Sequence, residues 1–235
     1  MSETPFCPKP GFHSPEALIS LTLARPPKDS PRHAEQIAIK DAFVALYLQE
    51  EKPPAEQLAR KYMLLLDKYF FFGSLCTIMK LSVLQEDTNK PNLCGVHIPS
   101  TREIRLYLRP EGRQRQPDEV LATLIHEMVH AYIKNFSNKY LAKSPQELGA
   151  HRRHGVYWNS LFLSIVNQVR SWDSKLEGFV TKAYRKTSQK YEIQEREDLG
   201  LLTKKLSELD LEKNKHKNKE HNGGKNKGGK DVGPG

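Results

Sequence analysis

Apolar residues recur at helical spacing in two neighbouring stretches of the N-terminal half. The first stretch, 35–49, carries Ile37, Ile39, Phe43, Leu46 and Tyr47. Pro53 and Pro54 interrupt this pattern, and Pro54 can open the next helix because proline is tolerated in a first helical turn. The second stretch repeats apolar residues at steps of three and four, namely Leu58, Tyr62, Leu65, Leu66 and Tyr69. The pattern predicts two helices, and most of the rings in the cluster 69–73 that follows are expected in the core.

Three short segments with strand-like composition come next, at 76–84, 95–97 and 104–108. Turn-forming runs separate them, among them Asp87-Thr88-Asn89 and Pro99-Ser100. The segments predict a small sheet, which we take to be antiparallel.

Two more helices are predicted after the strands. Acidic residues follow Pro117 in a first turn, where they oppose the positive end of the helix dipole. This helix is expected to run to about residue 134. The other is expected at 156–172, where the apolar stripe consists of Trp158, Leu161, Phe162, Ile165 and Val169. With the sheet, these helices predict an α+β domain.

The ends of the chain differ in composition from its middle. Residues 1–34 are rich in proline and serine without a period, which predicts a flexible N-terminal arm. Residues 176–211 are charged and predict a helical extension, whereas 212–235 are rich in lysine and glycine and are expected to be disordered. This leaves 35–175 as the folded domain.

Charge and cysteine content narrow the choice of partner and compartment. The net charge is +9, which suggests a polyanionic partner such as nucleic acid, although a solvated lysine tail explains it equally well. The apolar stretches are too short to cross a bilayer. The N-terminus lacks a basic start followed by an apolar run, so we expect no secretion. Three cysteines without a CxxC pair fit a reducing compartment, the nucleus or the cytoplasm.

The helix expected after Pro117 contains the sequence His126-Glu127-Met128-Val129-His130. Residues four apart share one face of a helix, so both imidazoles can bind a single zinc ion. Glu127 is offset around the helix axis and can accept a proton from water at the metal. The alternative, two polar residues on a solvated helix face, is less favoured because the motif lies among predicted core residues.

A catalytic zinc site needs a third protein ligand. The metzincin spacing would place a histidine at 136, where the chain has Phe136, so that class is excluded. Spacing leaves Glu147, His151 and His154 about equally suitable. Tyr132, Tyr157 and Arg152 are candidates for stabilising an oxyanion, but a packing or surface role is favoured for each.

The core resembles the SprT-like family, and particularly the Spartan and Wss1-type metalloproteases. The resemblance covers roughly 55–172. It rests on the aromatic end of the second helix, on Cys94-Gly95, on the segment Leu121 to Tyr132 that holds the histidine motif, and on His154-Gly155-Val156-Tyr157-Trp158. It implies a zincin-like fold in which His154, followed by glycine and an aromatic residue, is the third zinc ligand.

The resemblance also implies an activity. It points to a zinc metalloendopeptidase that cleaves DNA-bound proteins, including DNA–protein crosslinks, as part of DNA repair. We expect DNA to bind through the basic surface and tail. Two other hypotheses stay open: a non-catalytic nucleic-acid-binding protein with a structural or vestigial zinc site, and a peptidase with no link to DNA. Glu127 argues against the first, since a structural site has no use for that carboxylate.

Overall fold

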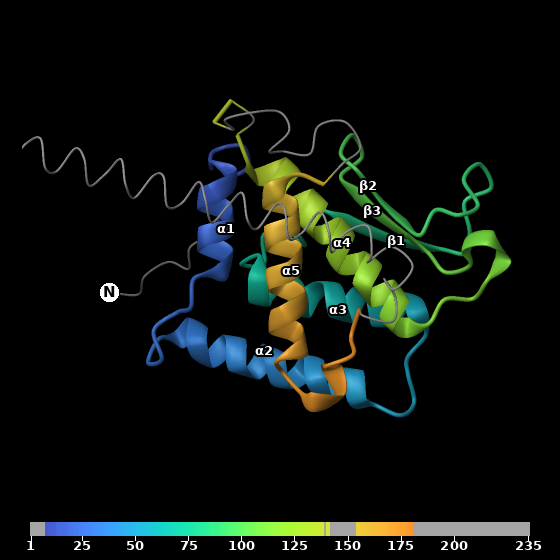
Figure 1. Ribbon diagram of the computed structural model, residues 1–235, viewed down its shortest axis with the longest axis horizontal. Coiled ribbons are helices and arrows are strands. Elements are labelled where there is room, and N and C mark those ends of the chain that lie inside the picture. The colour runs from blue at the N-terminus through green and yellow to red at the C-terminus, as the bar shows by residue number, and fades with distance from the viewer. Residues whose placement is uncertain (1–7, 139, 142–153, 181–235) are drawn as a thin grey trace, which may run out of the picture. The chain divides into compact units, whose positions relative to one another are not determined.

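The structure is a computed structural model, and it describes residues 8–138, 140–141 and 154–180. The described chain is a mixed α+β fold with five α-helices and one three-stranded sheet (Figure 1). The helices are α1 (Pro15–Leu23), α2 (Pro31–Leu48), α3 (Ala55–Phe70), α4 (Pro117–Phe136) and α5 (Val156–Arg170). The strands are β1 (Lys80–Leu84), β2 (Gly95–Ile98) and β3 (Glu103–Tyr107). The expectation of an α+β domain is confirmed.

The sheet is mixed rather than antiparallel. Its strand order is β1-β3-β2, with β1 parallel and β2 antiparallel to β3. Four residues, 99–102, join β2 to β3, which is enough for a hairpin but not for a parallel crossover. The longer connection 85–94 lets the chain pass from β1 to the far side of β3. The antiparallel expectation is therefore correct for β2 with β3 and wrong for β1 with β3.

The first strand begins at Lys80, four residues later than the predicted segment 76–84. Residues 71–78 instead form a series of turns after α3. Asp67, which is fully buried on α3, holds these turns, because its carboxylate accepts hydrogen bonds from the backbone N–H groups of Leu75 (2.9 Å) and Cys76 (2.7 Å). A side chain that binds backbone donors in this way competes with strand pairing.

Helix α4 runs through the middle of the fold, with α5 crossing it on one side and the sheet on the other (Figure 1). Its first turn is capped by Glu119, whose carboxylate accepts a hydrogen bond from the backbone N–H of Gln116 at 2.9 Å. Most of its side chains are buried, including Leu124, Met128 and Tyr132, which are fully enclosed. A helix buried on nearly all sides can hold polar residues only where other groups satisfy them.

The N-terminal region is ordered where a flexible arm was expected. Helix α1 packs against α5 and α4, and Leu18 at its centre is fully buried. Ser14 caps the helix by accepting a hydrogen bond from the N–H of Ala17, and proline follows it in the first turn. With only nine residues, the helix is too short for its apolar period to stand out in the sequence. The expected arm at 1–34 is therefore wrong for this part of the chain.

Residues that follow the expected end of the domain at 175 also belong to the core. Leu176, Phe179 and Val180 are buried, and Phe179 packs its ring edge-on to Tyr47 of α2. The domain thus continues at least to Val180. The helical extension expected over 176–211 lies outside the described residues from 181 onward, as does the tail 212–235.

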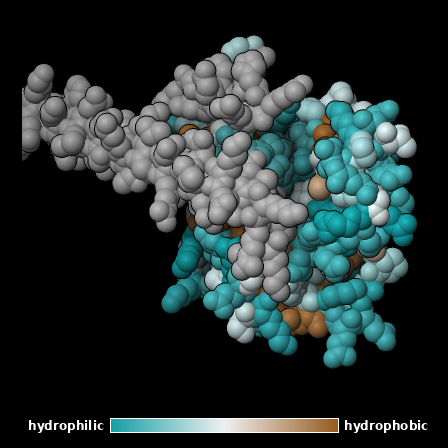
Figure 2. Space-filling model, turned by 45° about the vertical axis from the view of Figure 1, so that its right-hand side comes forward, coloured by the Kyte–Doolittle hydropathy of each residue, from teal (hydrophilic) through white to brown (hydrophobic). Residues whose placement is uncertain are grey.

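The face seen in Figure 2 is mainly hydrophilic where the structure describes it, with apolar atoms in small separate patches. This agrees with a core that collects most of the apolar side chains inside. None of the described helices combines the length and apolar content needed to span a membrane.

Candidate metal centre

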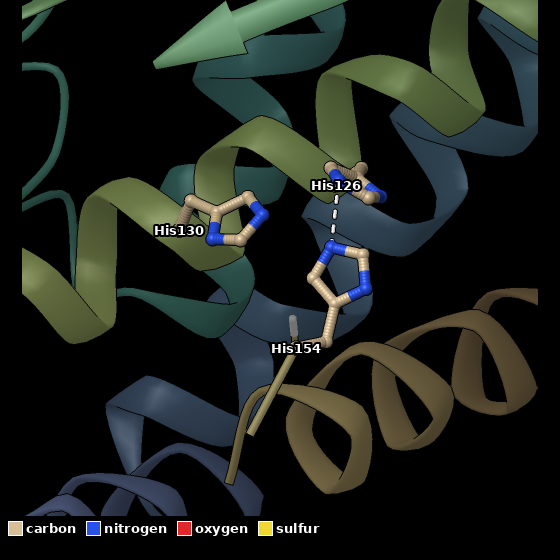
Figure 3. A group of neighbouring side chains, drawn as sticks. All are labelled: His126, His130 and His154. Carbon is tan, nitrogen blue, oxygen red and sulfur yellow. Dashed lines mark hydrogen bonds between the residues drawn. The ribbon is translucent and has the colours of Figure 1, made fainter. Parts of the chain in front are cut away.

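Three histidines from two parts of the chain come together beside α4. His126 and His130 lie one turn apart on the helix, and His154 comes immediately before Gly155, the N-cap of α5. One ring nitrogen of each histidine lies within 4.8 Å of those of the other two. Figure 3 shows the His154 ring reaching up from the start of α5 toward the two rings of α4. The three side chains are therefore close enough to bind one metal ion.

Nε2 of His126 and Nε2 of His154 lie 3.2 Å apart (Figure 3). A tetrahedral zinc ion with Zn–N distances of about 2.0–2.1 Å holds two ligand nitrogens about 3.3–3.4 Å apart. This pair therefore already has the spacing that a shared ion requires. The donor set itself, three imidazoles from one helix and one adjoining segment, suits zinc and the other transition metals that imidazole binds.

Burial keeps all three imidazoles neutral. The pKa of His126 lies well below its ordinary value because of burial and the nearby charges of His130 and His154. Burial, followed by the charge of His154, lowers the pKa of His130 to about 3, and burial lowers the pKa of His154 to about 4. At pH 7 each ring thus offers an unprotonated nitrogen, which is the form that binds metals.

Aromatic rings restrict how the histidines can turn. Trp158 stacks on His154, with ring centroids 3.7 Å apart, and contacts His126 and His130 at 4.5 and 5.1 Å. Phe162, one helical turn further along α5, stacks on this tryptophan in turn. Because Trp158 contacts all three rings, it restricts how they can be arranged.

Glu127 lies beside the histidines and is almost completely buried. Its Oε1 is 3.9 Å from Nε2 of His126, and it is not part of the group whose ligand atoms converge. His126 is neutral, so this contact is not an ion pair. Burial raises the pKa of Glu127 to about 7, while a hydrogen bond from the backbone N–H of His97 acts in the opposite direction. A carboxylate that titrates near pH 7 is suited to general base catalysis.

His97 on strand β2 is a neighbour of the site that the sequence pattern did not indicate. Its backbone N–H meets Glu127, and burial lowers the pKa of its imidazole to about 4. Nε2 of His97 is buried without a hydrogen-bond partner among the described residues. Only the placement of β2 along α4 reveals this neighbour, because His97 and Glu127 are thirty residues apart in the chain.

The other residues singled out from the sequence fall into two groups. Glu147, His151 and Arg152 lie outside the described residues, so the two alternative third ligands are not placed. The two tyrosines are held by structural partners. Tyr132 is fully buried and its hydroxyl accepts a hydrogen bond from Thr22 (3.3 Å), whereas the Tyr157 hydroxyl donates to Glu16 of α1. Their positions support packing rather than an oxyanion role.

Comparison with protein-family models, with curated proteins and with solved structures found no match for the chain. The functional argument therefore rests on the residues of the site.

Proposed function

We propose that the protein is a zinc-dependent metalloendopeptidase of the SprT-like type, with a zincin-like fold. The observation that carries this proposal is the convergence of His126, His130 and His154 beside the buried carboxylate of Glu127. Three neutral imidazoles would hold the ion and would leave a fourth position for water or substrate, as in catalytic zinc sites. A structural site has four protein ligands, and no fourth cysteine, histidine or carboxylate among the described residues joins this group.

In the proposed reaction, the zinc ion and the side chains of the protein have separate roles. Zinc lowers the pKa of water and polarises a carbonyl group. Glu127 accepts the proton of the attacking water on a carboxylate oxygen and passes it to the nitrogen of the leaving amine. Trp158 and Phe162 keep the histidine rings in place. The N–H of His97 holds the Glu127 carboxylate at the edge of the sheet.

The position of β2 supports a peptide as the substrate. Among the described strands, β2 has a neighbour on one side only, and its other edge faces Glu127. In the antiparallel register with β3, Val96 pairs with Arg105 and His97 with Ile104. An edge strand can add an extended peptide through those of its backbone groups that have no partner within the fold. A peptide bound there would present its backbone to the metal centre.

The decisive experiment compares the zinc-loaded wild type with Glu127→Gln, using a denatured protein as substrate. The variant should retain zinc but lose turnover by about 100-fold or more, because the general base is missing. Glu56→Gln is the matched control, since Glu56 is an exposed glutamate on α3 that forms a surface ion pair with Arg60. Equal activity in the wild type and Glu127→Gln would rule out the proposed chemistry and favour a non-catalytic zinc protein.

The third ligand is tested through zinc affinity. His154→Ala should lower zinc affinity by about 100-fold or more, because one of three protein ligands is lost. His33→Ala, a histidine on α2 away from the site, should bind zinc as the wild type does. Loss of zinc on changing His151 or Glu147, but not His154, would overturn this assignment.

The link to DNA is a further part of the proposal and rests on the family resemblance together with charge. The described residues contain 19 Lys and Arg and 17 Asp and Glu, a net charge of +2, out of +9 for the whole chain. The remaining positive charge belongs to the segments outside the described residues, which hold Arg152 and Arg153 and the lysine-rich tail. We therefore assign DNA binding mainly to these segments. The test is cleavage of a DNA-binding protein with and without single-stranded DNA.

A further inference from the structure

Strand β2 packs against α4, and position 95 lies beside Thr123 and Glu127 of that helix. Gly95 occupies this position in an ordinary strand conformation. A Cβ atom placed there would lie 2.5 Å from Cγ2 of Thr123, 3.3 Å from Cγ of Glu127 and 3.2 Å from the backbone oxygen of Arg105. The first distance is far below van der Waals contact, so any other residue would force the strand and helix apart.

Thr123 cannot easily turn its methyl group away. Its hydroxyl accepts a hydrogen bond from the guanidinium of Arg115 and donates one to the backbone oxygen of Glu119 at 3.0 Å. Both bonds fix the side-chain rotamer, and the methyl group then points at Gly95. Rotation to relieve a clash would break bonds that are largely shielded from water, where such bonds are expensive to lose.

Arg115 ties the strand and the helix together at the same place. Its guanidinium is almost completely buried and donates to the backbone oxygens of Cys94 (3.1 Å) and Tyr107 (3.3 Å) as well as to Thr123 and Glu119. The residue before Gly95 and the helix turn before Glu127 are thus held by one side chain. A displacement of β2 at Gly95 cannot be absorbed without moving these groups.

We propose that Gly95 is a positioning residue for Glu127: its missing side chain lets β2 lie against Thr123 and Glu127, at the spacing that aims the carboxylate at the three-histidine centre. Thr123 precedes Glu127 by one helical turn on the same face. A side chain at 95 therefore pushes on both residues and leaves the histidine face, which looks toward α5, untouched. This inference rests on the proposed peptidase function.

The test is a cycle of variants in the full-length zinc-loaded protein. Gly95→Ala should keep its zinc and lose about 10- to 100-fold in kcat, as expected when a catalytic group shifts by up to an ångström. Thr123→Ser removes the opposing methyl and keeps the hydroxyl that Arg115 and Glu119 use. The double variant Gly95→Ala/Thr123→Ser should therefore recover most of the lost kcat, whereas Thr123→Ser alone should stay close to wild type.

Gly178→Ala is the matched control, because a Cβ at Gly178 meets no atom of the described residues within 4 Å and the residue also has an ordinary backbone. It should leave both zinc content and kcat unchanged. A fully active Gly95→Ala, or a double variant no better than Gly95→Ala, would overturn the proposal. Loss of zinc in Gly95→Ala would also contradict it, because the histidines are predicted to be unaffected.

Thermal unfolding separates this proposal from the proposed function. Gly95→Ala should lower the melting temperature, and Thr123→Ser should raise it in that background while lowering it slightly in the wild type. If the wild type cleaves no substrate, the peptidase proposal fails. The opposite effects of Thr123→Ser on the melting temperature in the two backgrounds still show whether the side chains at 95 and 123 compete for one space. Additive effects on the melting temperature would show that they do not.

Discussion

Burial lowers the pKa of the histidines of the site and raises the pKa of its glutamate. In His97, His130 and His154 burial lowers the pKa, to about 4, 3 and 4 respectively. In Glu127 burial raises it to about 7. The ordinary values are 6.5 and 4.5. Between pH 7 and 5, these histidines take up protons in the unfolded chain but stay neutral in the folded chain. The free energy of unfolding therefore decreases as the pH is lowered. Glu127 takes up its proton in the folded chain first and opposes this fall.

The metal-free protein should therefore lose stability on acidification from pH 7 to pH 5. Each shifted histidine can remove up to about 2 kcal/mol over this range, less where the ring is partly exposed, and Glu127 returns a similar amount. Because several histidines act against one glutamate, the net effect is a loss. Urea unfolding in the presence of a chelator at the two pH values measures it.

Two variants isolate the opposing contributions. In Glu127→Gln, the free energy of unfolding should decrease more steeply from pH 7 to pH 5 than in the wild type, because the glutamate whose protonation offsets the histidines is gone. In His130→Gln, the free energy of unfolding should decrease less from pH 7 to pH 5, because one histidine with a lowered pKa is gone. Stability that rises toward pH 5 in Glu127→Gln would contradict the assigned directions.

At the scale of elements, α1 supplies packing that the sequence pattern did not indicate. It lies against α5, whose first residues follow His154, and Glu16 of α1 accepts a hydrogen bond from Tyr157 of α5. Thr22 reaches Tyr132 of α4 from the same helix. The element therefore supports both helices that carry the histidines, although it contributes no ligand itself.

Two leucines of α1 provide a matched test of this role. Leu18 is fully buried, whereas Leu23 is 39% exposed. Leu18→Ala should lower the free energy of unfolding by about 2–4 kcal/mol, in the range for a leucine removed from a packed core. Leu23→Ala should lower it by less than about 1 kcal/mol. Equal and small effects in urea unfolding would mean that the segment behaves as a flexible arm after all.

At the scale of the whole molecule, charge and fold are separated along the chain. The described residues are nearly balanced in charge, while residues 213–235 carry seven lysines and two acidic residues. If the tail binds DNA, we expect its lysines to contact the phosphates. Lysines that no folded structure positions bind the backbone charge and do not distinguish base sequences. Such affinity depends strongly on salt.

Removal of 213–235 should therefore weaken DNA binding and flatten its salt dependence. The slope of log K against log salt should fall by roughly 0.9 for each phosphate that the shortened chain no longer neutralises. Fluorescence anisotropy with a labelled duplex at several salt concentrations measures both quantities. A tail of equal length with its lysines changed to glutamine is the control for chain length. Unchanged binding after removal would favour a peptidase whose tail serves only solubility.

The sequence by itself determined the local parts of this protein. Helical periodicity and proline placed α2 to α5 to within a few residues, because the apolar residues of these helices recur at helical spacing. The spacing of His126 and His130 also follows from the helix alone, since residues four apart share a face. The short α1 and the start of β1 were not predicted correctly, because a side-chain cap and a buried carboxylate define them and no apolar period does.

Only the tertiary structure decided which distant groups meet. Spacing left three residues about equal as the third ligand, and the packing of α5 against α4 is what brings His154 within 3.2 Å of His126. The same holds for β2, whose position beside α4 joins His97 and Gly95 to Glu127. Such contacts depend on how buried faces pack together in space, and the periodicity of the sequence does not predict that packing.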